Sequence, residues 1–339
     1  MNHQEFSRLL EQKKLPSVLF FEGAEEYLKE TALRNLRSAL LPAGLEDLNE
    51  SRLDAPDASA VIAAAETLPF MAERRLVLLR DHPAVVGRGE ADESLLAYLP
   101  HVPPTAVVLF YCVLPVKQKK IRNLVQKQGG LVTFEPLSDR ELTSFVTSAF
   151  HDLGRECDAR TADFLVFTSG RDLNLLLREI GKIAAYHPEE PSVRPEEIRA
   201  LATPSAESRV FDMVNAIVAG DGKRAFTLLR NLLQNGERRI MILSLLLRQF
   251  RLMQQIRIMQ YEKLRPQEIQ SALGMNSWAA QQLARQAGAF TGRQIRDAVA
   301  LCLEADLNTK SGVLREEGAL EALMFRLLLL KEPGNQNPG

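Results

Sequence analysis

The sequence predicts an α/β domain followed by a part made only of helices, and three observations lead to this fold class. Up to about residue 136, short apolar runs alternate with segments of helical period, and the runs span 18–21, 51–54, 76–79, 107–110 and 131–134. Strands that alternate with helices indicate a parallel sheet covered on both faces. After Pro136 no further strand is evident, and apolar residues recur at helical spacing almost to the end of the sequence.

The predicted helices of the first part lie between these strands. They span 25–41, 58–66, 93–99 and 117–127, and a short helix precedes the first strand. Ser138, with Glu141 three residues later, forms a capping box that opens the helical part. Further helices are expected at about 139–152, 159–168, 171–186 and 196–202. From 209 to 330 the pattern is helical throughout, with breaks at the glycines of 220–222, 236, 274 and 292.

The loops and breaks between these segments predict three domains and a tail. Residues 1–137 form the α/β domain, 138–206 a small helical domain and 207–331 a larger helical domain; prolines in 187–195 and at Pro204 mark loops. The last residues, 332–339, have the composition of a disordered tail. This order resembles an AAA+-like module, in which a small helical lid follows the sheet domain, with an added helical collar for oligomerisation.

Net charge, the length of apolar runs and the cysteines limit the classes of protein to which this sequence can belong. The net charge of −1 means that no global field attracts nucleic acid, so any DNA contact must come from local patches. Apolar runs are too short for a membrane span, and the N-terminus lacks a signal-peptide pattern. The cysteines, Cys112, Cys157 and Cys302, are far apart, which fits a reduced cytosol and argues against zinc or a disulfide framework. A cytoplasmic protein is therefore expected.

The first strand runs into a loop that has the outline of a phosphate-binding loop without its chemistry. Gly23 and Lys29 have the required spacing, but Leu28 replaces the second glycine and Glu30 replaces the Ser/Thr that would ligate magnesium. Leucine would crowd a phosphate, and the carboxylates in and after the loop would repel it. After the third strand, Asp81 offers one carboxylate only. We expect no nucleotide site.

Other catalytic or metal-binding signatures are missing from the sequence. The five histidines have no H-x₃-H or HExxH spacing, and no G-x-S-x-G or other nucleophile motif is present. We therefore expect no cofactor, no metal and no catalytic site.

Large apolar side chains occupy a predicted turn at Leu68, Pro69, Phe70 and Met71. Proline removes a backbone donor and biases Leu68 to an extended conformation, so neither the preceding helix nor the following strand can run through it. Apolar residues at an exposed turn cost solvation free energy unless they pack or meet a partner. Two interpretations remain open: the side chains tuck under the edge of the sheet, or they bind another protein.

Residues 105–134 contain no carboxylate but several cations: Lys117, Lys119, Lys120, Arg122 and Lys127. At about 100° per residue, the last four fall on one arc of the predicted helix, opposite its apolar residues. The arc is either a solvated helix face or a patch that contacts phosphates.

The long predicted helix 238–257 is also rich in arginine, at 238, 239, 248, 251 and 257. Here a structural role in collar packing and ion pairs between subunits is favoured, and its leucines read as bundle core. Trp278 is also expected in the core.

Together these segments resemble the delta subunits of bacterial DNA polymerase III clamp loaders. The resemblance covers nearly the full length and is carried by 19–27, 66–79, 169–183, 210–217, 221–229 and the long helix from 239. The missing phosphate-binding loop also fits, because delta-type subunits keep the AAA+ fold without binding ATP.

The resemblance implies a function and a set of partners. A delta subunit binds the ring-shaped sliding clamp (beta) and holds one interface open, within a pentamer that contains ATP-binding motor subunits and a delta-prime subunit and that acts on primed DNA. An apolar plug enters a pocket of the clamp, and the matching residues here are Leu68, Pro69, Phe70 and Met71. Because Pro69 separates the large residues, whether Leu68 or Met71 accompanies Phe70 stays open.

Three alternatives to this interpretation can be told apart. A divergent AAA+ ATPase would bind nucleotide as an isolated chain. A delta-prime-type scaffold would carry zinc-binding cysteines and a Ser-Arg-Cys arginine finger, whereas Cys112 is the only cysteine among the first 150 residues. A generic DNA-binding scaffold would lack affinity for the clamp.

Overall fold

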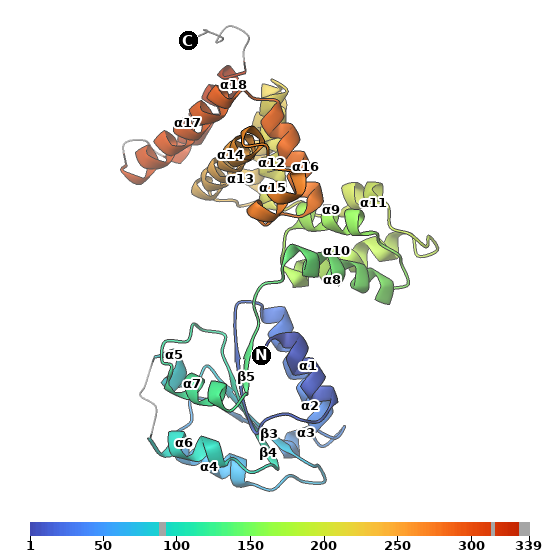
Figure 1. The fold of residues 1–339 in the computed structure, drawn as a ribbon, viewed down its shortest axis with the longest axis vertical. Coiled ribbons are helices and arrows are strands. Elements are labelled where there is room, and N and C mark those ends of the chain that lie inside the picture. The colour runs from blue at the N-terminus through green and yellow to red at the C-terminus, as the bar shows by residue number, and fades with distance from the viewer. Residues whose placement is uncertain (88–92, 313–315, 332–339) are drawn as a thin grey trace. The chain divides into compact units, whose positions relative to one another are not determined.

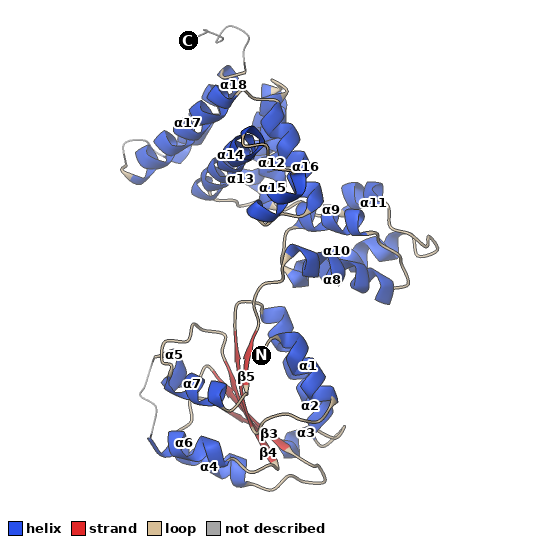
Figure 2. Cartoon of the chain, viewed as in Figure 1, coloured by secondary structure: helices blue, strands red, loops and turns tan. Residues whose placement is uncertain are grey.

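The computed structural model describes residues 1–87, 93–312 and 316–331. The chain divides into two compact units, Met1–Leu137 and Ser138–Gly339. The first unit is α/β and the second is helical, so the predicted fold class is confirmed (Figure 1; Figure 2). In the described part of the chain, no helix has both the length and the apolar character needed to cross a membrane. The predicted tail, 332–339, lies outside the described residues.

The first unit contains one five-stranded parallel sheet with the order β2-β3-β4-β1-β5. The strands are β1 (Val18–Glu22), β2 (Glu50–Leu53), β3 (Arg75–Arg80), β4 (Ala106–Tyr111) and β5 (Leu131–Thr133). Each lies within a residue or two of a predicted run. The central strands are buried on both faces, which explains why they read as continuous apolar runs rather than as alternating ones.

Helices cover both faces of this sheet (Figure 1). They are α1 (His3–Glu11), α2 (Glu26–Leu40), α3 (Glu46–Asn49), α4 (Ala58–Glu66), α5 (Pro83–Val86), α6 (Glu93–Tyr98) and α7 (Lys120–Lys127). Residues alternate between two cores along each strand: Phe20 packs on the side of α4 to α7, and Phe21 packs on the side of α1 and α2. The sheet is therefore the middle layer of three.

One predicted helix begins later than expected. The pattern predicts its start at Lys117, but α7 starts at Lys120. The backbone N–H groups of Lys117 and Gln118 both donate to the Val85 carbonyl at 3.0 Å. These residues are therefore committed to the end of α5 and cannot begin a helical turn.

Apart from an isolated β-bridge between Glu156 and Ser192, the regular elements in the described residues of the second unit are helices. Its helices are α8 (Asp139–Asp152), α9 (Ala159–Ser169), α10 (Leu173–Tyr186), α11 (Pro195–Leu201), α12 (Ala206–Val218), α13 (Gly222–Gln234), α14 (Arg239–Tyr261), α15 (Pro266–Leu273), α16 (Ser277–Gly288), α17 (Gly292–Lys310) and α18 (Glu316–Leu329). The predicted capping box of Ser138 and Glu141 is present at the start of α8. A buried cluster centred on α14, with Leu246, Phe250 and Met253 inaccessible to solvent, joins α12 to α18. The division of this unit at 206/207 stays a prediction.

Candidate functional site

The loop between α4 and β3 exposes three large apolar side chains. Leu68 is 76%, Phe70 is 52% and Met71 is 78% exposed, and Pro69 between them is half-buried. In this structure the three side chains do not tuck under the edge of the sheet. Scattered exposed apolar residues are normal, but three on one short turn make this loop a candidate surface for a partner.

Two neighbouring arginines hold the ends of this loop. The Arg75 guanidinium is buried at the start of β3, where it donates to the Thr67 carbonyl at 3.2 Å and to the Ser51 hydroxyl at 2.7 Å. Arg74 donates to the carbonyls of Leu15 and Ala106 and to a serine hydroxyl. Burial lowers the pKa of both guanidinium groups. Both ends of the loop, after α4 and before β3, are therefore held by arginines that are fixed inside the unit.

The middle of the loop is held by Asn49, the last residue of α3. Its side-chain oxygen accepts from the Phe70 N–H at 2.7 Å, and its side-chain nitrogen donates to the Phe70 carbonyl at 2.9 Å and the Leu45 carbonyl at 3.1 Å. The next residue, Met71, has φ of +51°, a left-handed conformation that costs a non-glycine residue about 1–2 kcal/mol. The hydrogen bonds to Phe70 thus stabilise a turn that the backbone alone would disfavour.

The backbone of Phe134, just after β5, lies directly against the degenerate phosphate-binding loop. Gly23 has φ of +120°, and a Cβ at this position would lie 2.2 Å from the Phe134 carbonyl oxygen. The Glu25 N–H donates to that same oxygen at 3.0 Å. Gly23 is therefore required by the close approach of the chain after β5, and one amide that could face a phosphate is already paired.

Lys29 does not project from this loop as a phosphate ligand would. Helix α2 begins at Glu26, so Leu28 and Lys29 are already in its first turn, with Leu28 packed against the core below α1 and α2. The Lys29 ammonium is buried and contacts a Glu26 carboxylate oxygen and the Cys112 carbonyl, both at 2.7 Å. Glu30 is exposed. The Lys29 ammonium is therefore committed to contacts within the unit.

The neighbours of Lys29 are equally occupied. Tyr111 donates its hydroxyl to Glu26 at 2.6 Å, and burial, with the nearby carboxylate, raises the pKa of this tyrosine. Burial raises the pKa of the Cys112 thiol to about 12, so this cysteine is not a nucleophile at neutral pH. In the described residues, no group of three or more histidine, cysteine or carboxylate side chains is arranged to hold a metal ion.

The predicted basic residues divide into two kinds. Lys117, Lys119, Lys120 and Lys127 are exposed, and no carboxylate among the described residues lies within ion-pair distance of them. Arg122 instead forms two hydrogen bonds to Glu22, at 2.6 and 2.7 Å, which tie α7 to the end of β1. Of the predicted arc, the residues without an ion-pair partner in the described part of the chain are therefore Lys119, Lys120 and Lys127.

In the second unit the arginines of α14 include two that form ion pairs within the chain. Arg239 pairs with Glu321 at 2.6 Å and Arg248 with Glu207 at 2.7 Å. Trp278 is only half-buried and packs on Phe164 and Phe167 of α9 rather than in the main helical core.

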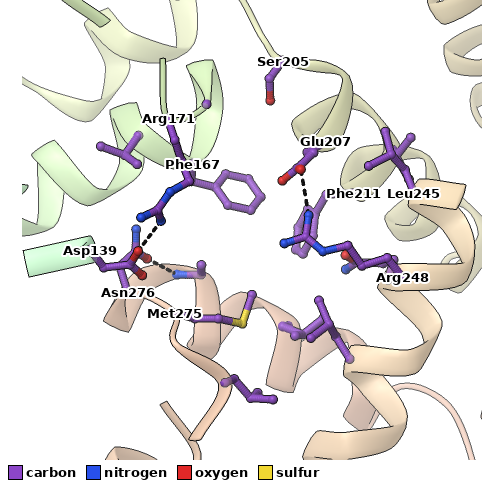
Figure 3. Close-up of a pocket in the computed structure, with 18 of the residues that line it drawn as sticks. Asp139, Phe167, Arg171, Ser205, Glu207, Phe211, Leu245, Arg248, Met275 and Asn276 are labelled. Carbon is purple, nitrogen blue, oxygen red and sulfur yellow. Dashed lines mark hydrogen bonds and ion pairs between the residues drawn. The ribbon is translucent and has the colours of Figure 1, made fainter. Parts of the chain in front are cut away.

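A pocket lies between α9, α12, α14 and the segment before α16 (Figure 3). Phe167, Phe211, Leu245 and Met275 contribute apolar surface, and two ion pairs, Arg248–Glu207 and Arg171–Asp139, belong to its lining. Its charges are balanced, and no pattern in the sequence predicts it.

Asn49 is the residue of the loop site that sequence reasoning missed. It stands 21 positions before Phe70, and no local pattern links the two. The Arg74-Arg75 pair at the start of a buried strand was a usable signal, because charged residues are almost never fully buried without a fixed partner.

Three comparisons place the chain among known proteins. It is 24% identical over 341 residues to the DNA polymerase III subunit delta of Bacillus subtilis (strain 168), and the match covers 97% of each chain. It is 23% identical over 241 residues to a probable DNA polymerase III subunit delta of Aquifex aeolicus (strain VF5), covering 68% of this chain and 67% of that protein. A solved structure of the Bacillus subtilis DNA clamp loader delta protein matches with a TM-score of 0.55 at 22% identity, over 96% of this chain and 99% of that one.

The structural match supports the fold, a parallel sheet domain followed by helices, as the sequence predicted. Two family models match most of the chain between them. The model described as DNA polymerase III, delta subunit, matches residues 19–135, and a model of the C-terminal domain of the same family matches 207–327. The chain therefore belongs to the family of DNA polymerase III delta subunits.

Proposed function

We propose that this chain binds the sliding clamp of DNA replication and helps to open it, as the clamp-binding subunit of a clamp loader. The observation that carries this proposal is the anchored turn of Leu68, Pro69, Phe70 and Met71. Three large apolar side chains are exposed there, while the backbone beneath them is fixed by buried polar groups. A rigid apolar projection of this kind suits a pocket on a partner, since little conformational entropy remains to be lost on binding.

The expected strength of the contact follows from the size of the side chains that it would bury. Burying a side chain of the size of Phe, Leu or Met contributes about 1.5–3 kcal/mol, and central aromatic anchors dominate interfaces of this size. Phe70 is the aromatic member of the group, so we expect it to be the main anchor. Phe70→Ala should weaken clamp binding by roughly ten- to a hundredfold, at about 1.4 kcal/mol per decade.

The test is the affinity of the purified chain for the purified clamp, measured for Phe70→Ala and for a matched control, Tyr186→Ala. Tyr186 is an aromatic residue with similar exposure, 55%, but it lies on the second unit at the end of α10. The melting temperature is measured alongside, because loss of a core phenylalanine would cost about 3–5 kcal/mol of folding stability. Normal clamp binding by a folded Phe70→Ala chain would refute the proposal.

We further propose that the subunit is non-catalytic and takes its energy from neighbours. Lys29 is paired inside the unit and Leu28 occupies the position of the second loop glycine, so the loop offers a phosphate neither a free ammonium group nor the usual second glycine. The ATP would be held by motor subunits of the same complex, and the remaining position would be filled by a delta-prime subunit. The divergent-ATPase alternative would need a nucleotide site, and the contacts of Lys29 and Leu28 argue against one.

A second contact, with primed DNA in the assembled complex, is supported by the lysines around α7. Lys117, Lys119, Lys120 and Lys127 are exposed without an ion-pair partner in the part of the chain that the structure describes. Unpaired cations that are free to displace counterions are what phosphate contacts require. Arg122 is left out of this proposal because Glu22 already neutralises it.

A further inference from the structure

We propose that Asn49 is a positioning residue for the clamp-binding turn: it holds the backbone of Phe70 in the conformation that the clamp recognises. This inference rests on the proposed function, since it concerns how that same surface is prepared for binding. Asn49 itself is inaccessible to solvent. It cannot touch a partner, so any effect it has on clamp binding must act through the loop.

The hydrogen bonds of the Asn49 side chain support this positioning role. Its amide pairs with both backbone groups of Phe70, at 2.7 and 2.9 Å, in the way that a neighbouring strand would. Only asparagine or glutamine can donate and accept from one side chain end in this manner, and aspartate would lack the donor. The third bond, to the Leu45 carbonyl at 3.1 Å, fixes the amide to its own helical turn.

The backbone next to Asn49 is itself held in place by ion pairs of Glu50. The next residue, Glu50, begins β2 and accepts two-point hydrogen bonds from Arg37 of α2 at 2.7 to 3.1 Å. A second arginine, Arg52, pairs with the same carboxylate. Burial works against ionisation of Glu50, but the hydrogen bonds of Arg52 and Arg37 outweigh it, and its pKa is lowered. The position of Asn49 is thus set by the sheet and α2 and not by the loop it holds.

The need for such a residue comes from the backbone that follows. Met71 has a left-handed conformation, with φ of +51°. Without the two bonds to Phe70, the turn would sample other conformations and only a fraction would be competent to bind. The apparent dissociation constant rises as that fraction falls, and in a rapid pre-equilibrium the loss shows in the association rate.

The experiment measures association and dissociation rates of the full-length chain with the purified clamp. For Asn49→Ala we expect about tenfold slower association, which corresponds to about 1.4 kcal/mol, with a dissociation rate within about twofold of the parent value. Phe70→Ala should instead dissociate faster, because contacts are lost. In the Phe70→Ala background, Asn49→Ala should change the affinity by less than about twofold, since the two act through one contact.

Val132→Ala is the matched control. Val132 is buried on β5, at the opposite edge of the sheet from β2, so its loss lowers stability without touching the loop. If Asn49→Ala lowers the melting temperature like Val132→Ala and leaves both rates unchanged, the residue is merely structural and the inference is wrong, although the proposed function stands. If Phe70→Ala itself leaves clamp binding unchanged, the proposed function fails, and the inference fails with it.

A second measurement needs no variant. In the parent chain the Phe70 amide donates to a buried oxygen at 2.7 Å, although its side chain is half-exposed. We expect its hydrogen exchange to be slowed at least about tenfold relative to the Glu73 amide of the same loop. Equal exchange at the two amides would overturn the inference even if Asn49→Ala does not fold.

Discussion

At the scale of single residues, Lys29 shows how a position of a phosphate-binding loop can be put to another use. Its ammonium group is buried and contacts the Glu26 carboxylate and the Cys112 carbonyl, so it joins α2 to the end of β4. A charged group inside a protein is tolerated only when it is paired in this way. Lys29 therefore contributes to folding, where the equivalent lysine of a nucleotide-binding protein contributes to ligand affinity.

This role predicts that Lys29→Met lowers stability. The substitution keeps the apolar stem but removes charge-assisted hydrogen bonds, and because Glu26 is partly exposed and can be solvated, we expect a loss of about 2 kcal/mol. Lys127→Met, at an exposed lysine, should stay within about 0.5 kcal/mol. Urea unfolding of the two variants measures the difference. Equal stability of parent and Lys29→Met would show that the buried pair contributes nothing.

The contacts of Lys29 also lead to a prediction about nucleotide binding. The isolated chain should give no heat with magnesium-ATP in calorimetry, since Leu28 and the buried Lys29 close the loop. Binding in the micromolar range would contradict this expectation and favour the divergent-ATPase alternative.

At the scale of elements, the loop from 67 to 74 is short, anchored at three points and exposed at its tip. Its left-handed residue, Met71, allows a substitution that separates backbone from side chain. Asparagine tolerates this conformation better than other non-glycine residues, so Met71→Asn should leave stability within about 1 kcal/mol. It should weaken clamp binding by less than Phe70→Ala does.

Leu68→Ala, measured beside Met71→Asn, decides which of the two accompanies Phe70 in the pocket. The two parent side chains are about equally exposed, so the larger loss of affinity identifies the inserted one. If neither changes the affinity, the contact is made by Phe70 alone.

Elements of regular pattern could be predicted from the sequence, and those fixed by distant contacts could not. All five strands could be located, because buried parallel strands read as apolar runs bounded by helical segments. The four-residue helices α3 and α5 are too short to show a period, and the start of α7 depends on hydrogen bonds to Val85. For the candidate site, the apolar turn of Leu68 to Met71 stands out in the sequence, but the residues alone left open whether these side chains are buried or exposed. Asn49 could not, because its function exists only once α3 lies against the loop.

At the scale of the whole molecule, a net charge of −1 means that any attraction to DNA is local. The exposed lysines around α7 are therefore tested in the assembled loader and not in the isolated chain. Lys119→Glu together with Lys120→Glu should weaken binding to primed DNA and reduce the slope of log affinity against log salt by about two units, roughly one for each lost phosphate contact.

The control for this double reversal is a second pair of exposed lysines with the same change in net charge. Lys223→Glu with Lys263→Glu, on the second unit, should leave the slope within about half a unit if the effect is local. The melting temperature of both double variants should stay near that of the parent, because neither pair is buried. An equal change of slope in both variants would mean that total charge governs DNA binding, and an unchanged slope in Lys119→Glu/Lys120→Glu would show that this face of α7 is simply solvated.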